Sequence, residues 1–213
     1  MRTKDIEKEE RKKKQILEGC FKLLLRKNMG NITIDDIEKC TGFTRSNIYF
    51  YFKDKEEIFR ATTEFYYQRV QEYFAFFFQK EKKTLLQFIH DYIDNWKNFD
   101  ESIKDVTQDD FASILSFFFN AFNLYPEFAD RIKNLFEQEQ KCWEGVIELA
   151  VSHKEVKDIN IEFTAEKFHF AYMAVTLQSY FLPYNKKANI LLAHMMNLYE
   201  EIKYKEPMQK TIF

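Results

Sequence analysis

The sequence is poor in residues that interrupt regular structure. Among its 213 residues are 4 glycines and 3 prolines, which leaves few of the turns that β-sandwiches, barrels and alternating βαβ folds require. No glycine-rich phosphate-binding loop, HExxH pattern or GxSxG pattern occurs. In contrast, 46% of the residues are hydrophobic, which is too many for a disordered chain. The composition therefore predicts an all-α protein.

Cysteine is also scarce, and the pattern of its use indicates a reducing compartment. Cys20, Cys40 and Cys142 are odd in number and have no CxxC spacing, so we expect them to pack as small apolar side chains in the cytoplasm. The charged N-terminal segment has no apolar run behind it and predicts no secretory signal. The most apolar stretch, residues 111–125, is too short and too polar to span a bilayer. These features predict a cytoplasmic protein without membrane contact.

Metal-ligating and catalytic side chains do not form a recognisable cluster. His90 and Asp94 are four residues apart and could share one helix face, but no third ligand can be identified. No carboxylate–His or Cys–His arrangement for catalysis is evident either. The sequence therefore predicts no metal, no cofactor and no enzymatic activity.

Charge is divided unevenly along the chain. Residues 1–60 carry 15 Lys and Arg against 11 Asp and Glu, whereas the remaining residues carry 17 against 23. A solvated, random distribution would also allow this difference. The opposite signs favour a basic N-terminal part attached to an acidic body.

Apolar periodicity and capping residues predict about nine helices and no strand. Gly30 is expected to end the first helix, and Thr107 is expected to open the sixth. Thr84 and Gln87 have the spacing of a capping box for the fifth. The predicted helices cover residues 11–28, 34–40, 45–52, 54–80, 84–99, 107–124, 127–152, 164–181 and 186–203.

The second and third of these helices form a helix-turn-helix pattern over residues 33–52. Thr33 is positioned to cap the first helix, and Gly42 is expected to close the turn with a positive φ. Phe43 would pack the turn, and Thr44 would cap the second helix, whose N-terminus could face a phosphate. The exposed face would then present Arg45, Ser46, Asn47 and Tyr49, and partly Phe50 and Tyr51. Such side chains suit base edges and phosphates.

Four segments resemble the DNA-binding domain of the TetR/AcrR family of transcriptional regulators. They are residues 33–37 (TIDDI), 42–44 (GFT), 48–52 (IYFYF) and 53–59 (KDKEEIF). The sequence departs from the family pattern at Glu38 and Thr41, where alanine is usual, and at Phe50, where His or Tyr is usual. The resemblance covers residues 6–66, and it leaves residues 67–205 as a helical body matched only in shape.

The resemblance implies particular roles for residues of the motif. Arg45, Ser46, Asn47 and Tyr49 would lie in the major groove of DNA, with Phe50 beside them. Thr33, Thr44, Tyr51 and Lys55 would contact phosphates. The alternative is that the tyrosines are half-buried aromatic residues and that the start of the helix is simply solvated.

The body is rich in aromatic residues, and family members resemble one another in binding a small effector there. Such rings at helical spacing can also form a plain core. The candidates for a pocket that holds an apolar or aromatic effector are Trp96, Phe99, Phe118, Phe122, Tyr125, Phe136, Trp143 and Tyr172.

The last two helices look like the pair that forms a four-helix bundle with a second subunit in this family. The alternative is that they close the core of a monomer. The candidate interface residues are Phe168, Tyr172, Val175, Ser179, Leu191, His194, Met195, Leu198 and Ile202.

Together these features favour a homodimeric repressor that binds a pseudo-palindromic double-stranded DNA operator and is released by a small molecule. A first alternative is an activator or ligand-independent regulator of the same fold. A second is a helical carrier or enzyme whose motif match is accidental.

Overall fold

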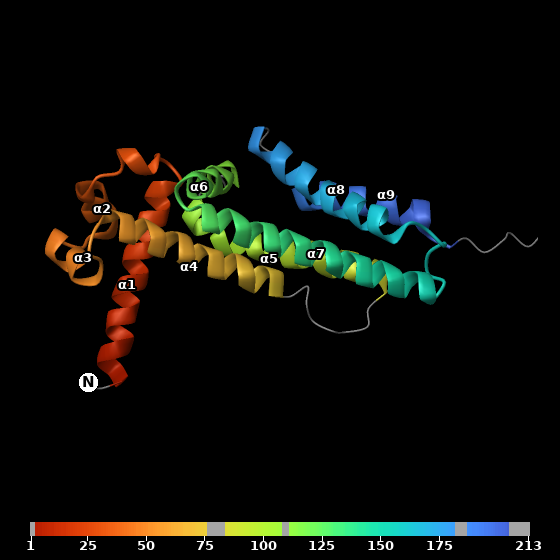
Figure 1. Ribbon diagram of the computed structural model, residues 1–213, viewed down its shortest axis with the longest axis horizontal. Coiled ribbons are helices and arrows are strands. Elements are labelled where there is room, and N and C mark those ends of the chain that lie inside the picture. Colours follow the sequence, from red (N-terminus) through yellow and green to blue (C-terminus); the bar gives the residue numbers. More distant parts are fainter. Residues whose placement is uncertain (1–2, 76–83, 108–110, 182–186, 205–213) are drawn as a thin grey trace, which may run out of the picture. The chain divides into compact units, whose positions relative to one another are not determined.

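The computed structural model describes residues 3–75, 84–107, 111–181 and 187–204 (Figure 1). Within these ranges the chain forms nine α-helices and one 3₁₀ turn, η1, and its only β-type pairing is an isolated bridge between Val156 and Lys203. The all-α prediction is therefore confirmed. The helices are α1 (Thr3–Leu24), α2 (Ile34–Thr41), α3 (Arg45–Tyr51), α4 (Lys55–Ala75), α5 (Leu85–Thr107), α6 (Phe111–Leu124), α7 (Pro126–Ser152), α8 (Ile161–Phe181) and α9 (Lys187–Ile202), and η1 covers Met29–Asn31.

The chain divides into two compact units. The first comprises residues 1–73 and 99–133, and the second comprises residues 74–98 and 134–213. The domain boundary predicted between residues 66 and 67 falls inside α4, and this helix continues through the boundary. The boundary stays a prediction.

Apolar faces of α1 to α4 meet in the core of the first unit. Ile16 and Phe21 of α1 are buried together with Ile37 of α2, Ile48 of α3 and Phe59 of α4. This burial explains why two helices as short as α2 and α3 are stable, because packing rather than intrinsic propensity supplies most helical stability. The core fixes α3 so that its other face is exposed.

Helices α1 and α2 approach closely at Gly19. A Cβ atom at this buried position would lie 2.5 Å from Cγ2 of Thr41, a distance that atoms do not tolerate without a shift. The hydroxyl of Thr41 donates to the carbonyl of Ile37 at 2.7 Å and accepts the N–H of Phe43 at 3.2 Å, which fixes the rotamer of Thr41. Glycine is therefore required at position 19 by the space available.

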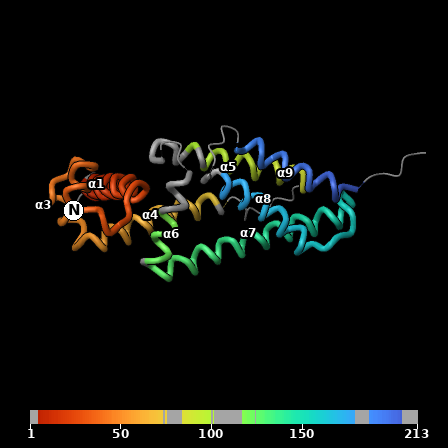
Figure 2. Tube along the Cα trace, turned by 90° about the horizontal axis from the view of Figure 1, so that it is seen from above, coloured from red at the N-terminus to blue at the C-terminus, as the bar shows by residue number. Residues whose placement is uncertain are grey.

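The second unit is centred on Trp143 of α7, which is fully buried. Its indole ring is stacked on Phe168 of α8, with centroids 4.7 Å apart, and meets Phe88 of α5 edge-on at the same distance. Helices α8 and α9 run side by side in both views (Figures 1 and 2). The unit is thus a helical bundle with an aromatic core.

Several helix boundaries differ from the sequence-based prediction. Helix α1 begins at Thr3 and ends at Leu24, because its charged first turns have no apolar periodicity to reveal them. Gly30 lies in η1 and does not end α1. Thr107 is the last residue of α5 and does not open α6. Predicted helix residues 76–80 lie outside the described ranges.

Two further predictions concern cysteine and membrane contact. Cys20 is buried, as predicted, whereas Cys40 is exposed and Cys142 is half-buried. Burial raises the pKa of the Cys20 thiol to about 12. Over the described residues, no helix is long and apolar enough to cross a membrane.

Candidate nucleic-acid interface

A reciprocal capping box begins α2. The Thr33 hydroxyl accepts the N–H of Asp36 at 3.2 Å, and the Asp36 carboxylate accepts the backbone N–H of Thr33 at 2.9 Å and its hydroxyl at 2.8 Å. Lys27 donates to the same carboxylate at 2.9 Å. The N–H of Thr33, followed by the ammonium of Lys27, holds the pKa of Asp36 well below its usual range. The predicted cap at Thr33 is confirmed, and its hydroxyl is engaged within the protein.

The turn between α2 and α3 depends on the backbone freedom of Gly42. This residue has φ 74° and ψ 4°, in the left-handed region, and its N–H donates to the carbonyl of Glu38 at 2.8 Å. A Cβ atom at Gly42 would meet nothing within 4 Å. Backbone conformation rather than space therefore selects glycine, as the sequence predicts.

Helix α3 is anchored on one side and exposed on the other. The Thr44 hydroxyl accepts the N–H of Asn47 at 3.4 Å, and Ile48 and Phe52 are buried. Tyr51 is half-buried, and its ring meets Phe50 edge-on at 5.0 Å. The exposed side chains are Arg45, Ser46, Asn47, Tyr49 and Phe50, the predicted face, and 71% of Phe50 is accessible.

Two carboxylates of α2 occupy the start of α3. Glu38 accepts the backbone N–H of Arg45 at 2.6 Å and lies 3.9 Å from the Arg45 Nε, while Asp35 pairs with the guanidinium directly. The first amide of α3 is therefore already satisfied by a carboxylate. From the sequence, Glu38 was a departure from the family pattern, expected to point outward or to pair with a neighbour such as Lys39 or Lys22, and its contact with Arg45 was not predicted. The sequence feature that could have indicated this contact is the i, i+3 spacing of Asp35 and Glu38, because it places both carboxylates on one side of α2.

Lys55 connects the start of α4 to the segment before α2. Its Nζ donates to the carbonyl of Ile32 at 3.1 Å and lies 5.8 Å from the ring centroid of Phe59. Asp54 caps α4 by accepting the N–H of Glu57 at 2.8 Å. Lys55 is half-buried, so its ammonium is held near the motif and not extended into solvent.

The eight residues predicted to line an effector pocket are divided between the two units. Phe99, Phe118, Phe122 and Tyr125 belong to the first unit, and the other four belong to the second. Phe118 and Phe122 pack on Phe128 with centroids 5.9 and 5.8 Å apart. In the second unit Trp96 and Trp143 are buried, Phe136 contacts His169, and Tyr172 packs edge-on to Tyr92.

A buried carboxylate lies beside the rings of the second unit. Glu139 of α7 is 1% exposed; it accepts the hydroxyl of Tyr92 at 2.6 Å and lies 3.3 Å from Nδ1 of His169. Burial, reinforced by the charge of Glu139, raises the pKa of Tyr172. Sequence reasoning did not single out Glu139, because one glutamate on a polar helix carries no distinguishing pattern.

The nine candidate dimer residues differ in their exposure. Phe168, Val175, Leu191 and Met195 are buried within the chain's own core. Tyr172, Leu198 and Ile202 are half-buried, His194 is exposed, and the side chain of Ser179 lies outside the described part. The large apolar side chains that α8 exposes are Phe163, Phe170, Met173 and Leu177.

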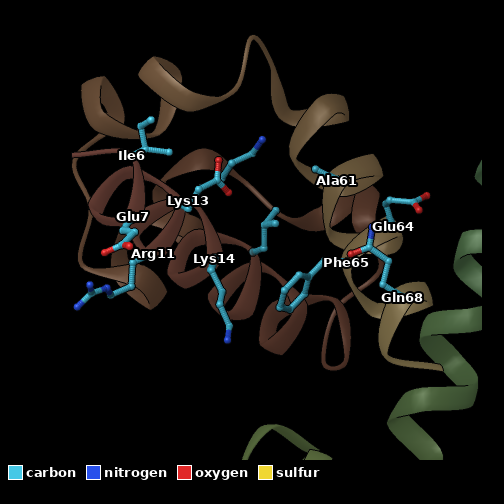
Figure 3. Close-up of a pocket in the computed structure, with 11 residues that line it drawn as sticks. Ile6, Glu7, Arg11, Lys13, Lys14, Ala61, Glu64, Phe65 and Gln68 are labelled. Carbon is cyan, nitrogen blue, oxygen red and sulfur yellow. The ribbon is translucent and has the colours of Figure 1, made fainter. Parts of the chain in front are cut away.

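A cavity of about 800 Å³ lies between α1 and α4 in the first unit (Figure 3). Leu17, Ala61 and Phe65 contribute apolar surface. Three acidic and three basic side chains balance one another around them, and none of the eight candidate pocket residues lines this cavity. The charged lining residues are Glu7, Glu10, Arg11, Lys13, Lys14 and Glu64.

Among the described residues no group of three or more His, Cys, Asp and Glu side chains could hold a metal ion. Asp94, one of the two residues considered for such a site, pairs with Lys97 at 2.9 Å.

Comparisons with known proteins agree with this geometry. Residues 16–62, which include α2, the turn and α3, match the family model of bacterial regulatory proteins of the tetR family. No curated protein matches the chain in sequence.

Solved structures match almost the entire chain. A TetR-family transcriptional regulator from Cytophaga hutchinsonii has a TM-score of 0.67 at 16% identity, covering 93% of this chain and 98% of that one. A second TetR-family transcriptional regulator, from Agrobacterium tumefaciens, has a TM-score of 0.62 at 18% identity, and the match covers 92% of this chain and 99% of that one. A putative transcriptional regulator from Saccharomonospora viridis, in complex with choline, has a TM-score of 0.65 at 13% identity, and the match covers 91% of this chain and 98% of that one. The chain thus has the all-α fold of these regulators, and its helix-turn-helix segment lies within residues 16–62, which match the tetR family model.

Proposed function

We propose that the chain is a cytoplasmic, homodimeric repressor that binds a pseudo-palindromic operator through α3 and leaves it when a small molecule binds. The observation that carries this proposal is the exposed face of α3. Arg45 and Asn47 offer the guanidinium and carboxamide groups that read purine edges in a major groove, and Tyr49 adds a hydroxyl suited to a phosphate or base.

Dimerisation is proposed because one short recognition helix in one groove binds too weakly to select a site. Exposed apolar residues on α8 support it. Phe163, Phe170 and Leu177 are seven residues apart, so they share one helix face, and Met173 lies between two of them. A contiguous exposed apolar stripe of this kind is typical of a protein interface.

The proposed effector is apolar or aromatic, and neutral or cationic. The aromatic core of the second unit supports an apolar ligand. The buried carboxylate of Glu139 beside Tyr92 supports a positive charge over a negative one. The similar regulator from Saccharomonospora viridis was solved with choline, a small cation.

Selection from random-sequence DNA tests the DNA-binding proposal. The protein is expected to enrich duplexes with two inverted half-sites about one helical turn apart, roughly 34–36 Å. Asn47→Ala is expected to relax base preference in each half-site. Failure to enrich any sequence, at salt concentrations where the protein is folded, would overturn the proposal.

Fluorescence of Trp143 provides the effector test, since its indole is stacked on Phe168 in the core. Apolar and cationic aromatic compounds are expected to change tryptophan fluorescence and to release DNA at the same concentrations. Release by a phosphorylated metabolite, with no effect of those compounds, would contradict the proposed effector class.

A further inference from the structure

Arg45 is held on the protein surface by two carboxylates from another helix. Asp35 pairs with the guanidinium, and Glu38 contacts both the guanidinium and the backbone N–H of Arg45. The side chains of Arg45 and Asp35 are 55% and 63% exposed, and that of Glu38 is 32% exposed. Ion pairs at this exposure are weak, so a better partner can displace them.

The same carboxylates change what α3 offers to DNA. The N-terminus of a helix normally presents free N–H groups that attract a phosphate. Here Glu38 occupies the first of these N–H groups, and Thr44 accepts from Asn47 further along. A phosphate approaching this end would meet the two carboxylates, and the N–H groups of Arg45 and Asn47 already have acceptors.

We infer that Asp35 and Glu38 determine the specificity of the DNA interface, an inference that rests on the proposed function. Nonspecific binding comes almost entirely from attraction between basic side chains and phosphates, and the two carboxylates oppose it. They also retain Arg45 unless DNA offers a better partner. A guanine edge, which accepts two hydrogen bonds from one guanidinium, is such a partner, so Arg45 contributes on the correct sequence and stays with the carboxylates elsewhere.

Neutral variants of the two carboxylates test this inference. Glu38→Gln retains an oxygen that can accept the Arg45 N–H, and Asp35→Asn retains the size of the side chain. Glu72→Gln is the matched control: it removes one exposed carboxylate from the same unit, about 25 Å along α4 from Lys55. Each protein is titrated against the duplex that the wild type enriches and against a scrambled duplex of equal length, at several salt concentrations.

Both variants are expected to bind scrambled DNA more tightly, by about threefold or more at low salt, with a steeper dependence on salt. Affinity for the enriched duplex should change by less, so the ratio of the two affinities falls. Glu72→Gln should leave that ratio unchanged. In an Arg45→Ala background, Glu38→Gln should lower the ratio less than it does in the wild type.

Three outcomes are distinguishable. If Glu38→Gln and Asp35→Asn raise the affinity for both duplexes by one common factor, the carboxylates act only through net charge. The inference is then overturned, while the proposed function stands. If the wild type enriches no duplex, the proposed function fails and the inference fails with it. Nuclear magnetic resonance of the Arg45 guanidinium without DNA gives an independent measure. If the guanidinium rotates freely in the wild type, and equally freely in Asp35→Asn, the inference is also overturned.

Discussion

The Glu155 carboxylate accepts the backbone N–H of Leu85 at 2.9 Å, although 70 residues separate them in sequence. It also accepts the N–H of Leu86 at 3.0 Å and lies 3.3 Å from the Tyr199 hydroxyl. Burial, followed by the charge of Glu155, raises the pKa of Tyr199 and keeps its hydroxyl protonated as a donor. Glu155 therefore joins the start of α5, the segment after α7, and α9 within the second unit.

Replacing Glu155 should destabilise this unit. Glu155→Ala leaves two N–H groups of α5 without their acceptor and is expected to lower the free energy of unfolding by about 1–3 kcal/mol. Glu155→Gln retains an acceptor but loses the negative charge at a helix N-terminus, so it should lose less. Urea denaturation measures both, with the exposed Glu148→Ala on α7 as control. Equal stability of Glu155→Ala and the control would contradict the capping role.

Acid should weaken the ion pair between Glu64 of α4 and Arg131 of α7. Arg131 donates to both carboxylate oxygens and lies 3.8 Å from the ring centroid of Tyr67. The hydrogen bond from Arg131 lowers the pKa of Glu64 below its ordinary 4.5. The pair therefore stabilises the fold above about pH 4.5, and its contribution is lost as the pH falls through the lowered pKa.

The Glu64 side chain is 43% exposed, so its coupling to Arg131 should be about 1 kcal/mol or less. A double-mutant cycle with Glu64→Gln and Arg131→Met, run at pH 7 and at pH 3, measures it. The coupling should be smaller at pH 3, and a coupling that grows on acidification would contradict the assignment.

Gly19→Ala should destabilise the first unit although alanine favours helices. The added Cβ would meet Cγ2 of Thr41 at 2.5 Å, and overpacking of this kind costs about 1–3 kcal/mol, more than the roughly 1 kcal/mol gained in helix propensity. Thr41→Ser removes the methyl group but keeps the hydroxyl. In that background Gly19→Ala should become neutral or stabilising, as thermal unfolding would reveal. Equal destabilisation in both backgrounds would exclude the contact as the cause.

A charge within the apolar stripe of α8 should separate the proposed dimer. Phe170 is 61% exposed, so Phe170→Glu should fold normally yet sediment as a monomer at micromolar concentration, because a charge at the centre of an apolar interface stays unpaired. Gln138→Glu, at an exposed position on α7, adds the same charge and should remain dimeric. A monomeric wild type would refute dimerisation, and a dimeric Phe170→Glu would place the interface elsewhere.

Lys55→Ala should weaken binding to all DNA sequences alike. Loss of one phosphate contact from each protomer should flatten the salt dependence of log K by about two units per dimer. Lys55→Arg retains the charge and should keep the slope. Because Lys55 also donates to the carbonyl of Ile32, the thermal stability of each variant must be measured alongside. An unchanged slope in a stable Lys55→Ala variant would exclude the phosphate contact.

The motif was predictable because each of its features is local. Capping by Thr33 and Thr44, the turn at Gly42 and the inward position of Ile48 each depend on residues within a few positions of one another. The exposed face of α3 follows from these anchors. The acidic partners of Arg45 were missed because they belong to another helix, and their distance from Arg45 depends on how tightly Gly42 closes the turn.

The body was less predictable because its helices are apolar on more than one side. Along α8, Phe168 and Val175 point inward while Phe170 and Leu177 are exposed, and a pattern of apolar residues alone does not separate these two faces. Only the contact with Trp143 identifies the inner one. Candidate pocket rings such as Phe99 and Trp143 were grouped by composition, and the structure assigns them to different units.

The contact between Gly19 and Thr41 also constrains how the sequence can diverge. Position 19 can accept alanine only after position 41 has lost its methyl branch, because the reverse order passes through a clash at 2.5 Å. The two positions should therefore covary among descendants of this chain: lineages with a larger residue at 19 should carry a smaller one at 41. Covariation of positions 19 and 41 in an alignment would then indicate how closely α1 and α2 pack.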